Sequence, residues 1–318
     1  MDEKNREHHL ESGFTEEILR LNAVPAPLFG TYTVPRGGSG KVPAALILPG
    51  SGPVDRDGNI PGTETGCIKA LAHELAHQGI ASLRIDKRGV GASREAAPSE
   101  QELRLETYVA DAIRWLTALR EQTEVGRVYL IGHSEGALIA TIAAQRIPCD
   151  GLALLAGAGR PAGEVIRSQL VSTGIEMALV RAAGVILSAM ERGQTVDSVP
   201  PELNALFRPS VQPYLRSWLA VDPATELARV KVPTMVIQGD RDLQVSITDA
   251  RRLVAHQRDA QLTVVHGMNH ILRTVPTNRD ANLASYNVPS LPISASLPPI
   301  LADFMIPWRD SDTRRMMG

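Results

Sequence analysis

Short apolar runs recur along the chain, and stretches with helical spacing separate most of them. Each run is almost continuously apolar and closes on Gly, Pro or Asp, which is typical of a strand buried on both faces of a parallel sheet. The expected strands are residues 44–50, 80–86, 127–132, 151–157, 233–239 and 261–267. Helical patterns fill residues 66–78, 105–121, 136–146 and 247–257. The alternation predicts a doubly wound α/β fold with a mostly parallel sheet.

Two regions depart from this alternation. The segments FTEEILRL and FGTYTVPR near the N-terminus are typical of an antiparallel pair that leads into the sheet. Between Gly157 and Pro233 lie about 75 residues, against the roughly 30 that a strand–helix–strand unit needs. This insertion has helical spacing, and insertions at the carboxyl ends of strands overhang the ligand crevice of an open α/β sheet. We therefore expect a helical cap at residues 159–222, between core parts 1–158 and 223–318.

Composition excludes several classes of partner. The 33 Lys and Arg nearly cancel the 35 Asp and Glu, and neither sign is concentrated in a long run, so nucleic acid and anionic membranes are not expected partners. The apolar stretch MALVRAAGVILSAM is interrupted by Arg181 and is too short to span a bilayer. Residues 1–13 are charged and lack the apolar core of a secretory signal, which predicts a frayed arm. Two distant cysteines, Cys67 and Cys149, favour a reduced, cytoplasmic protein over a disulfide framework.

A polar corner lies between the strand pattern and the helix pattern of RVYLIGHSEGALIATIAAQ. Its centre, Gly132-His133-Ser134-Glu135-Gly136, matches the G-x-S-x-G nucleophile elbow, directly after a strand and before a helix. The turn is so tight that a Cβ at either glycine would clash with the neighbouring strand or helix, which holds the serine hydroxyl above the sheet edge. N–H groups at the helix start would face a developing oxyanion. The alternative is a Gly-Ser turn without chemistry, and the strand–turn–helix context favours the nucleophile.

An elbow serine needs a base and an acid, and in folds with this motif they follow in the order Ser, acid, His. Asp240 and Asp242 come just past the strand after the insertion, and His266 and His270 come just past the last strand. We favour His270 as the base, because it lies in the loop where its ring can reach the serine, and interpret His266 as structural. The loop geometry favours Asp242 as the acid and leaves Asp240 to cap the turn or pair with the adjacent arginine.

Together these segments resemble the α/β-hydrolases of the esterase, lipase and serine aminopeptidase type, over the chain from about residue 30 to 308. The motifs that carry the resemblance are GHSEG, GDRDLQV, GMNH and LRIDKRGVGAS. It implies a catalytic triad of Ser134, Asp242 and His270. It also implies a structural role for the turn DKRGVGAS beside the oxyanion loop. The two glycines of that turn lack the third glycine of a dinucleotide fingerprint.

The resemblance further identifies LPGSGPVDRDGN as the oxyanion loop. It implies that the backbone N–H groups of Ser51 and Glu135 are the two donors to the oxyanion. The loop begins with Pro-Gly where His-Gly is commoner, which leaves Gly52 as an alternative donor. Asp55, Arg56 and Asp57 in the same loop have two interpretations. They hold the loop in shape through ion pairs, which we favour, or one carboxylate faces a substrate ammonium group.

A rival chemistry comes from HELAH at residues 73–77, which matches the H-E-x-x-H motif of zinc proteases. The helical wheel argues against a metal site. Ile68, Leu71 and Leu75 cluster on one face, and His73 and His77 project from the opposite face toward solvent. We therefore interpret HELAH as a solvated helix face.

The expected reaction is hydrolysis of a carboxylic ester through an acyl-enzyme, with Asp242 orienting His270 and His270 taking the proton of Ser134. No metal or organic cofactor is required. The expected partner is a small-molecule ester with a short to medium or aromatic acyl group. A serine aminopeptidase or amidase that acts on small peptides or amides is the alternative, because the triad chemistry is the same. Bulky apolar residues of the cap, which should fix it to the core and line an apolar pocket, are Leu206, Phe207, Tyr214, Trp218 and Leu219.

Overall fold

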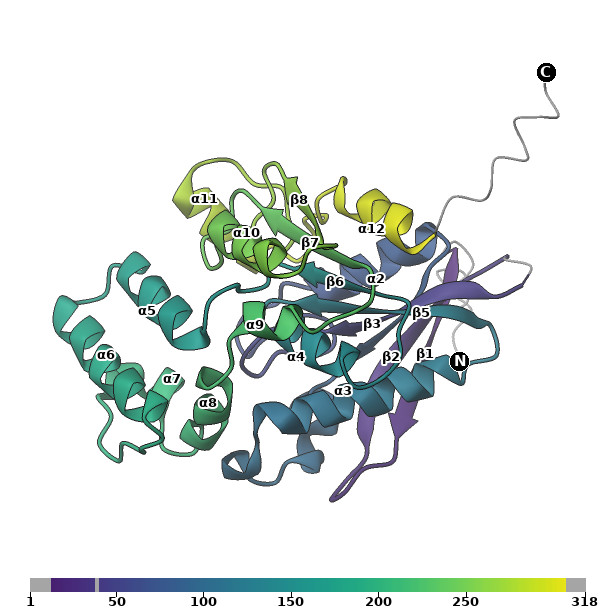
Figure 1. Cartoon of the computed structure of the whole chain (residues 1–318). Coiled ribbons are helices and arrows are strands. Elements are labelled where there is room, and N and C mark those ends of the chain that lie inside the picture. The colour runs from purple at the N-terminus through teal and green to yellow at the C-terminus, as the bar shows by residue number, and fades with distance from the viewer. Residues whose placement is uncertain (1–12, 38–39, 307–318) are drawn as a thin grey trace, which may run out of the picture.

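Eight strands form one sheet in the computed structural model, which describes residues 13–37 and 40–306. Their order across the sheet is β1-β2-β4-β3-β5-β6-β7-β8 (Figure 1). The second strand runs antiparallel to both of its neighbours, and all other neighbours run parallel. The antiparallel lead-in pair and the parallel sheet are both as predicted. The strands are β1 (Phe14–Leu21), β2 (Leu28–Pro35), β3 (Val42–Leu48), β4 (Ala81–Ile85), β5 (Val125–His133), β6 (Gly151–Leu155), β7 (Thr234–Gly239) and β8 (Gln261–Val265).

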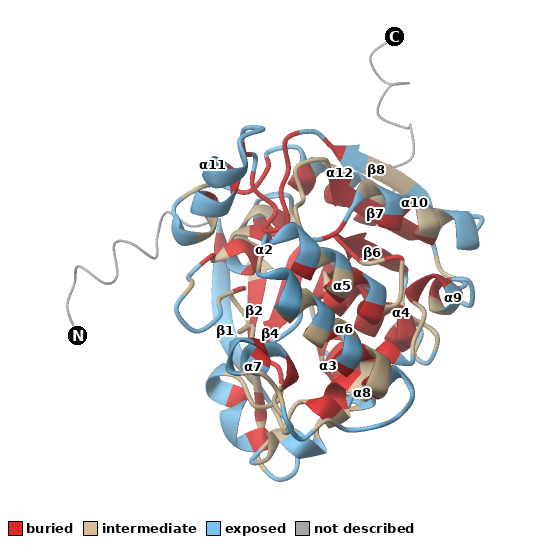
Figure 2. Ribbon diagram, turned by 90° about the vertical axis from the view of Figure 1, so that its left-hand side faces the viewer, coloured by how far each residue is buried: buried red, intermediate tan, exposed pale blue. Residues whose placement is uncertain are grey.

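The central strands are buried on both faces, as their continuous apolar sequences predict. Every residue of β4, β6 and β7 is buried, and these strands colour red through the middle of Figure 2. The prediction of a buried strand at residues 261–267 is wrong. Only Val265 of β8 is buried and Val264 is 44% exposed, because β8 is the edge of the sheet and pairs with β7 alone.

Helices cover both faces of this sheet. Val109 of α3, Leu138 of α4 and Leu253 of α10 belong to the apolar core on one face. Leu71 of α2 and Leu301 of α12 belong to the core on the other face. The helices of the two layers are α2 (Cys67–His77), α3 (Leu105–Arg120), α4 (Glu135–Ala144), α9 (Pro223–Leu227), α10 (Ile247–His256) and α12 (Leu297–Met305). Short elements in the loops are η1 (Gly91–Ala96), η2 (Glu100–Glu102), α11 (Arg279–Ala284) and η4 (Ser285–Asn287).

The long insertion between β6 and β7 is helical, as its spacing predicts. Its helices gather beside the sheet rather than on either face of it (Figure 1). They share an apolar core of their own, in which Ile166, Leu187 and Phe207 are buried. The elements are α5 (Ala162–Ser172), α6 (Met177–Glu191), η3 (Pro201–Leu203), α7 (Asn204–Phe207) and α8 (Gln212–Leu219).

Both cysteines are free thiols, with Cys67 buried and Cys149 partly exposed. Among residues 13–37 and 40–306, no helix has the length and apolar character needed to cross a bilayer. Most of the predicted N-terminal arm, residues 1–12, lies outside the described residues.

Candidate active site

Ser134 lies in the tight turn between β5 and α4, with φ 56° and ψ −119°. This left-handed backbone is strained for a residue with a side chain, and strain of this kind gathers at functional sites. A Cβ on Gly132 would lie 2.3 Å from the carbonyl oxygen of Gly136, and a Cβ on Gly136 would lie 2.2 Å from that of Leu48. The prediction that both glycines are required by close approach is therefore confirmed.

Three predicted side chains meet at this turn. The Nε2 atom of His270 lies 3.1 Å from Oγ of Ser134, and its Nδ1 atom lies 2.8 Å from Oδ2 of Asp242. They come from the ends of three strands, because Ser134 follows β5, Asp242 follows β7 and His270 follows β8. The side chain of His270 is 6% exposed and that of Asp242 is fully buried, whereas Ser134 is partly open to solvent. One face of the cluster is thus accessible to a substrate.

Asp242 is held as a carboxylate. Its Oδ1 accepts the backbone N–H groups of Gln244 at 2.7 Å and Val245 at 2.9 Å, and its Oδ2 accepts the side-chain amide of Gln238 at 3.0 Å. Burial alone would raise the pKa of Asp242, but the charge and hydrogen bond of His270 and the two N–H groups lower it below its usual value. The carboxylate can therefore fix the tautomer of His270 and stabilise its positive charge.

Asp240 and His266, the two residues that we did not assign to the triad, form a separate pair. Asp240 accepts from Nδ1 of His266 and from the backbone N–H of Gly267, each at 2.7 Å. The side chain of His266 is 86% exposed, so it is hydrogen-bonded as predicted but not packed. Arg241 approaches Asp240 only to 4.0 Å. This pair closes the loop after β8 and does not touch Ser134.

His133, the residue before the candidate nucleophile, was not singled out by sequence reasoning. Its Nε2 donates to the backbone carbonyl of His270 at 2.7 Å. Burial and the neighbouring His270 lower the pKa of His133 to about 4. The ring of His133 is therefore neutral at physiological pH. Its hydrogen bond connects the elbow to the loop that carries His270. Only its place inside the elbow motif could have indicated this role.

The predicted oxyanion loop, residues 48–59, passes directly beside the nucleophile. A Cβ on Gly50 would lie 3.2 Å from Cβ and 3.6 Å from Oγ of Ser134. Among the hydrogen bonds of the described residues, none uses the backbone N–H of Ser51 or Glu135 as donor. Both groups are thus available to a ligand. The alternative donor Gly52 has φ 78°, a conformation that favours glycine.

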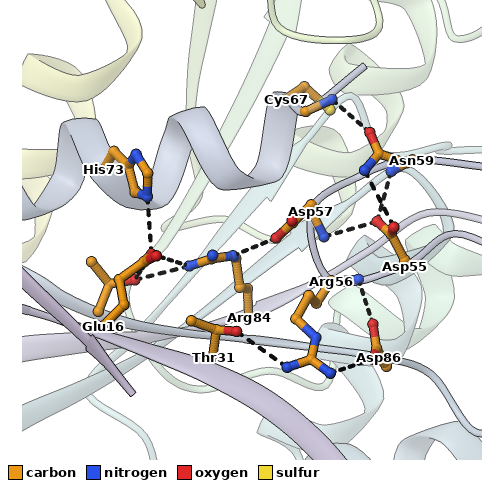
Figure 3. Close-up of polar contacts among 12 residues, drawn as sticks. Glu16, Thr31, Asp55, Arg56, Asp57, Asn59, Cys67, His73, Arg84 and Asp86 are labelled. Carbon is orange, nitrogen blue, oxygen red and sulfur yellow. Dashed lines mark hydrogen bonds and ion pairs between the residues drawn. The ribbon is translucent and has the colours of Figure 1, made fainter. Parts of the chain in front are cut away.

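The charged residues of this loop are engaged with the protein (Figure 3). Oδ1 of Asp55 accepts the backbone N–H of Asp57 at 2.9 Å. Arg56 forms an ion pair with Asp86, and Asp57 accepts from Nε of Arg84 at 2.8 Å. These contacts agree with the favoured interpretation, in which the three residues shape the loop. They also connect it to DKRGVGAS, the turn expected beside it, because Asp86 is the first residue of that turn.

The HELAH helix differs from its prediction at one histidine. His77 is half-exposed, but His73 is partly buried, packs on the ring of Phe14 and lies 2.9 Å from Oε1 of Glu16. The expectation that both rings face solvent is wrong for His73, because β1 runs past this helix. Within the described residues, no cluster of three or more His, Cys, Asp or Glu side chains could hold a metal ion.

The inserted helices reach the site through Tyr214 of α8. Its hydroxyl donates to Oε1 of Glu135, the residue after Ser134. Of the other bulky residues expected in the cap, Phe207 and Leu219 are buried in the apolar core of the insertion, which fixes its helices to one another. Trp218 is partly buried and Leu206 is 43% exposed.

Comparisons with known proteins bear on this geometry. The family described as serine aminopeptidase, S33 matches residues 62–274. The chain is 30% identical to Esterase EstD of Thermotoga maritima over 265 residues, which is 81% of this chain and 60% of that protein. The chain thus spans less than two thirds of the length of this relative.

Solved structures are similar in fold at lower identity. Est1E from Butyrivibrio proteoclasticus, with ferulic acid bound, matches with a TM-score of 0.57 and 17% identity over 85% of this chain and 96% of that chain. The acylaminoacyl peptidase of Pyrococcus horikoshii matches with a TM-score of 0.53 and 14% identity over 85% of this chain and 40% of that chain.

Proposed function

The chain belongs to the serine aminopeptidase S33 family and has the α/β-hydrolase fold, and on this premise we propose that it is a serine hydrolase that cleaves carboxylic esters. The proposal rests on one observation above all. His270 lies within hydrogen-bond distance of both Ser134 and a buried carboxylate, Asp242. This is the geometry that nucleophilic acyl transfer needs.

In the proposed reaction, Nε2 of His270 takes the proton of Ser134 as the hydroxyl oxygen attacks the ester carbonyl carbon. Asp242 holds the proton on Nδ1 and stabilises the imidazolium that forms. The tetrahedral intermediate collapses to an acyl-enzyme when His270 returns its proton to the departing alcohol. Water then attacks the acyl-enzyme with the same histidine as general base. His270 returns that proton to Oγ of Ser134 as the bond between the acyl carbon and Oγ breaks, and the acid leaves.

The developing oxyanion would bind the backbone N–H groups of Ser51 and Glu135. These groups belong to the two segments that flank Ser134, and neither has an acceptor among the described residues. Preorganised donors of this kind stabilise the transition state by about 3–4 kcal/mol each when measured by removal. The chemistry requires no metal or organic cofactor.

Esters are favoured over amides by two observations. The relative at 30% identity is an esterase by name. An aminopeptidase needs a carboxylate that faces the substrate ammonium group, and the two candidates for it, Asp55 and Asp57, are engaged with the loop backbone and with Arg84. The aminopeptidase or amidase is therefore the weaker alternative.

Residues 159–222 would act as the cap over this site, between core parts 1–158 and 223–318. The separate apolar core of the insertion and the contact of Tyr214 with Glu135 support this division. The substrate would be a small ester with a short to medium or aromatic acyl group. The two free, widely separated thiols are consistent with a cytoplasmic location.

The deciding experiment compares leaving groups. Purified protein is assayed against nitrophenyl acyl esters and aminoacyl nitroanilides of graded size. Turnover of the esters without turnover of the anilides is the expected result. Faster turnover of the anilides would replace the esterase with the aminopeptidase.

A further inference from the structure

A lysine is buried beside the elbow. The side chain of Lys87, the second residue of the DKRGVGAS turn, is 4% exposed. Its Nζ donates to the backbone carbonyl of Gly50 at 2.6 Å and lies 3.4 Å from Oε2 of Glu135. The same Nζ lies 5.3 Å from the centre of the Tyr108 ring. The triad mechanism does not use this lysine.

Burying an ammonium group is unfavourable unless charge and hydrogen bonds compensate for the lost water. Here burial lowers the pKa of Lys87, and the charge of Glu135 opposes that shift. The carboxylate of Glu135 is itself buried and accepts the hydroxyl proton of Tyr214 on its other oxygen. The lysine is therefore held by two acceptors, the carbonyl oxygen of Gly50 and the carboxylate of Glu135.

The carbonyl that Lys87 binds belongs to the same peptide unit as the N–H of Ser51. A trans peptide is planar, and its C=O and N–H point in opposite directions. Fixing the oxygen of Gly50 therefore fixes the direction of the Ser51 N–H. This unit is adjacent to the nucleophile, since a Cβ on Gly50 would lie 3.6 Å from Oγ of Ser134.

We propose that Lys87 is the positioning residue of the oxyanion hole, acting through the Gly50–Ser51 peptide, and that Glu135 and Tyr214 connect this peptide to the inserted helices. The inference rests on the proposed function, because it assigns Ser51 N–H as a donor to the oxyanion. Glu135 then serves twice, with its N–H as the second donor and its carboxylate as the counter-charge of the lysine. A shift of α8 would be transmitted to the oxyanion hole through Tyr214.

The first test is Lys87→Met, which keeps most of the apolar stem and removes the donor. We expect kcat for a nitrophenyl ester to fall about 10- to 100-fold, a fraction of the loss that follows removal of an oxyanion donor itself. KM should change little. Affinity for a trifluoromethyl ketone, which forms a tetrahedral oxyanion on the serine, should fall by a similar factor. A merely structural role would not weaken binding of the tetrahedral adduct more than binding of the substrate.

Lys69→Met, at an exposed position of α2, is the matched control and should behave as wild type.

The variant Lys87→Met leaves the buried Glu135 without its counter-charge and could fail to fold. The double variant Lys87→Met with Glu135→Gln removes both charges, and it should fold and show the same loss of kcat. Glu135→Gln and Tyr214→Phe alone keep the contact of Lys87 with Gly50, and each should lose less kcat than the double variant. If Lys87→Met, or the double variant, folds and keeps the wild-type kcat and ketone affinity, the inference is overturned. Ser134→Ala in the same assay separates the two proposals: if it remains active, the proposed function itself is wrong.

Discussion

His133 donates from Nε2 to the backbone carbonyl of His270 at 2.7 Å, so the residue before the nucleophile holds the main chain of the proposed base. Removing this buried donor leaves the carbonyl without a partner. We therefore expect His133→Phe to lower the free energy of unfolding by about 1–3 kcal/mol. It should also lower kcat more than it changes KM. Urea unfolding and steady-state kinetics measure the two effects, and unchanged stability would contradict the role.

Ser134→Ala should lower kcat by roughly four orders of magnitude or more, as loss of a triad member does. The fold should remain intact, because the change removes only one oxygen from a partly exposed side chain. A fluorophosphonate probe should label the wild type and not the variant, which mass spectrometry of the intact protein can measure. Labelling of the variant would place the nucleophile elsewhere.

Substitutions of the two aspartates after β7 should differ clearly in their effect on kcat. Asp242→Asn should lower kcat by about 10⁴-fold, because an amide cannot hold the correct tautomer of His270. Asp240→Asn should leave kcat near the wild-type value, since its partner His266 is a surface residue that does not touch Ser134. The measurement is kcat for one ester at constant pH. The opposite ranking would move the acid to Asp240.

A pH effect on stability is expected at Glu16. Burial alone would raise the pKa of Glu16, but hydrogen bonds from His73 and the buried Arg84 hold it well below its usual range. A carboxyl with a lowered pKa in the folded state stabilises the protein above its unfolded pKa of about 4.3, and this contribution is lost as the pH falls further. Glu16→Gln should therefore lower Tm most above about pH 5, and the difference from wild type should shrink below about pH 4. A difference that stays constant from pH 7 to pH 3 would exclude this ionic role.

Acyl-chain preference tests the proposed cap. The apolar residues of the insertion that do not fix its own helices should line the acyl pocket, and each buried methylene adds about 0.8 kcal/mol until the pocket is full. We expect kcat/KM to rise from acetyl to butyryl or hexanoyl nitrophenyl esters and to fall for long chains. A flat profile, or a best substrate with a free α-ammonium group, would contradict an apolar pocket.

The parallel core and the elbow could be predicted because local patterns determine them. Continuous apolar runs such as Gly151–Leu155 identify buried strands, and two glycines around a serine identify a turn that admits no Cβ. The elbow motif implies the order Ser, acid, His, the strand ends limit the candidates for the acid and the base, and the side chains of Ser134, Asp242 and His270 do meet. The exposed edge at β8 could not be predicted, because an apolar segment does not reveal how many strands flank it.

Contacts between segments that lie far apart in the sequence could not be predicted either. His73 bonds to Glu16, which is 57 positions away, and this contact depends on how β1 crosses α2. Lys87 belongs to a turn for which the sequence predicts only a structural role, since nothing in the neighbouring sequence indicates that its side chain reaches Gly50, 37 positions earlier. These contacts come from strand order and loop path, which a single sequence does not record.

Because of the two glycines of the elbow, mutagenesis of this turn cannot always separate an effect on folding from an effect on catalysis. Added carbon at Gly132 or Gly136 would meet main-chain atoms of Gly136 and Leu48, which have no alternative rotamer to adopt. Any substitution there must displace the end of β3, which leads into Ser51, or the start of α4, which contains Glu135. Variants at these two glycines therefore combine a folding defect with a chemical defect in one measurement. Ser134→Ala adds no atom to the turn, so Ser134 is the position where the two defects can be distinguished.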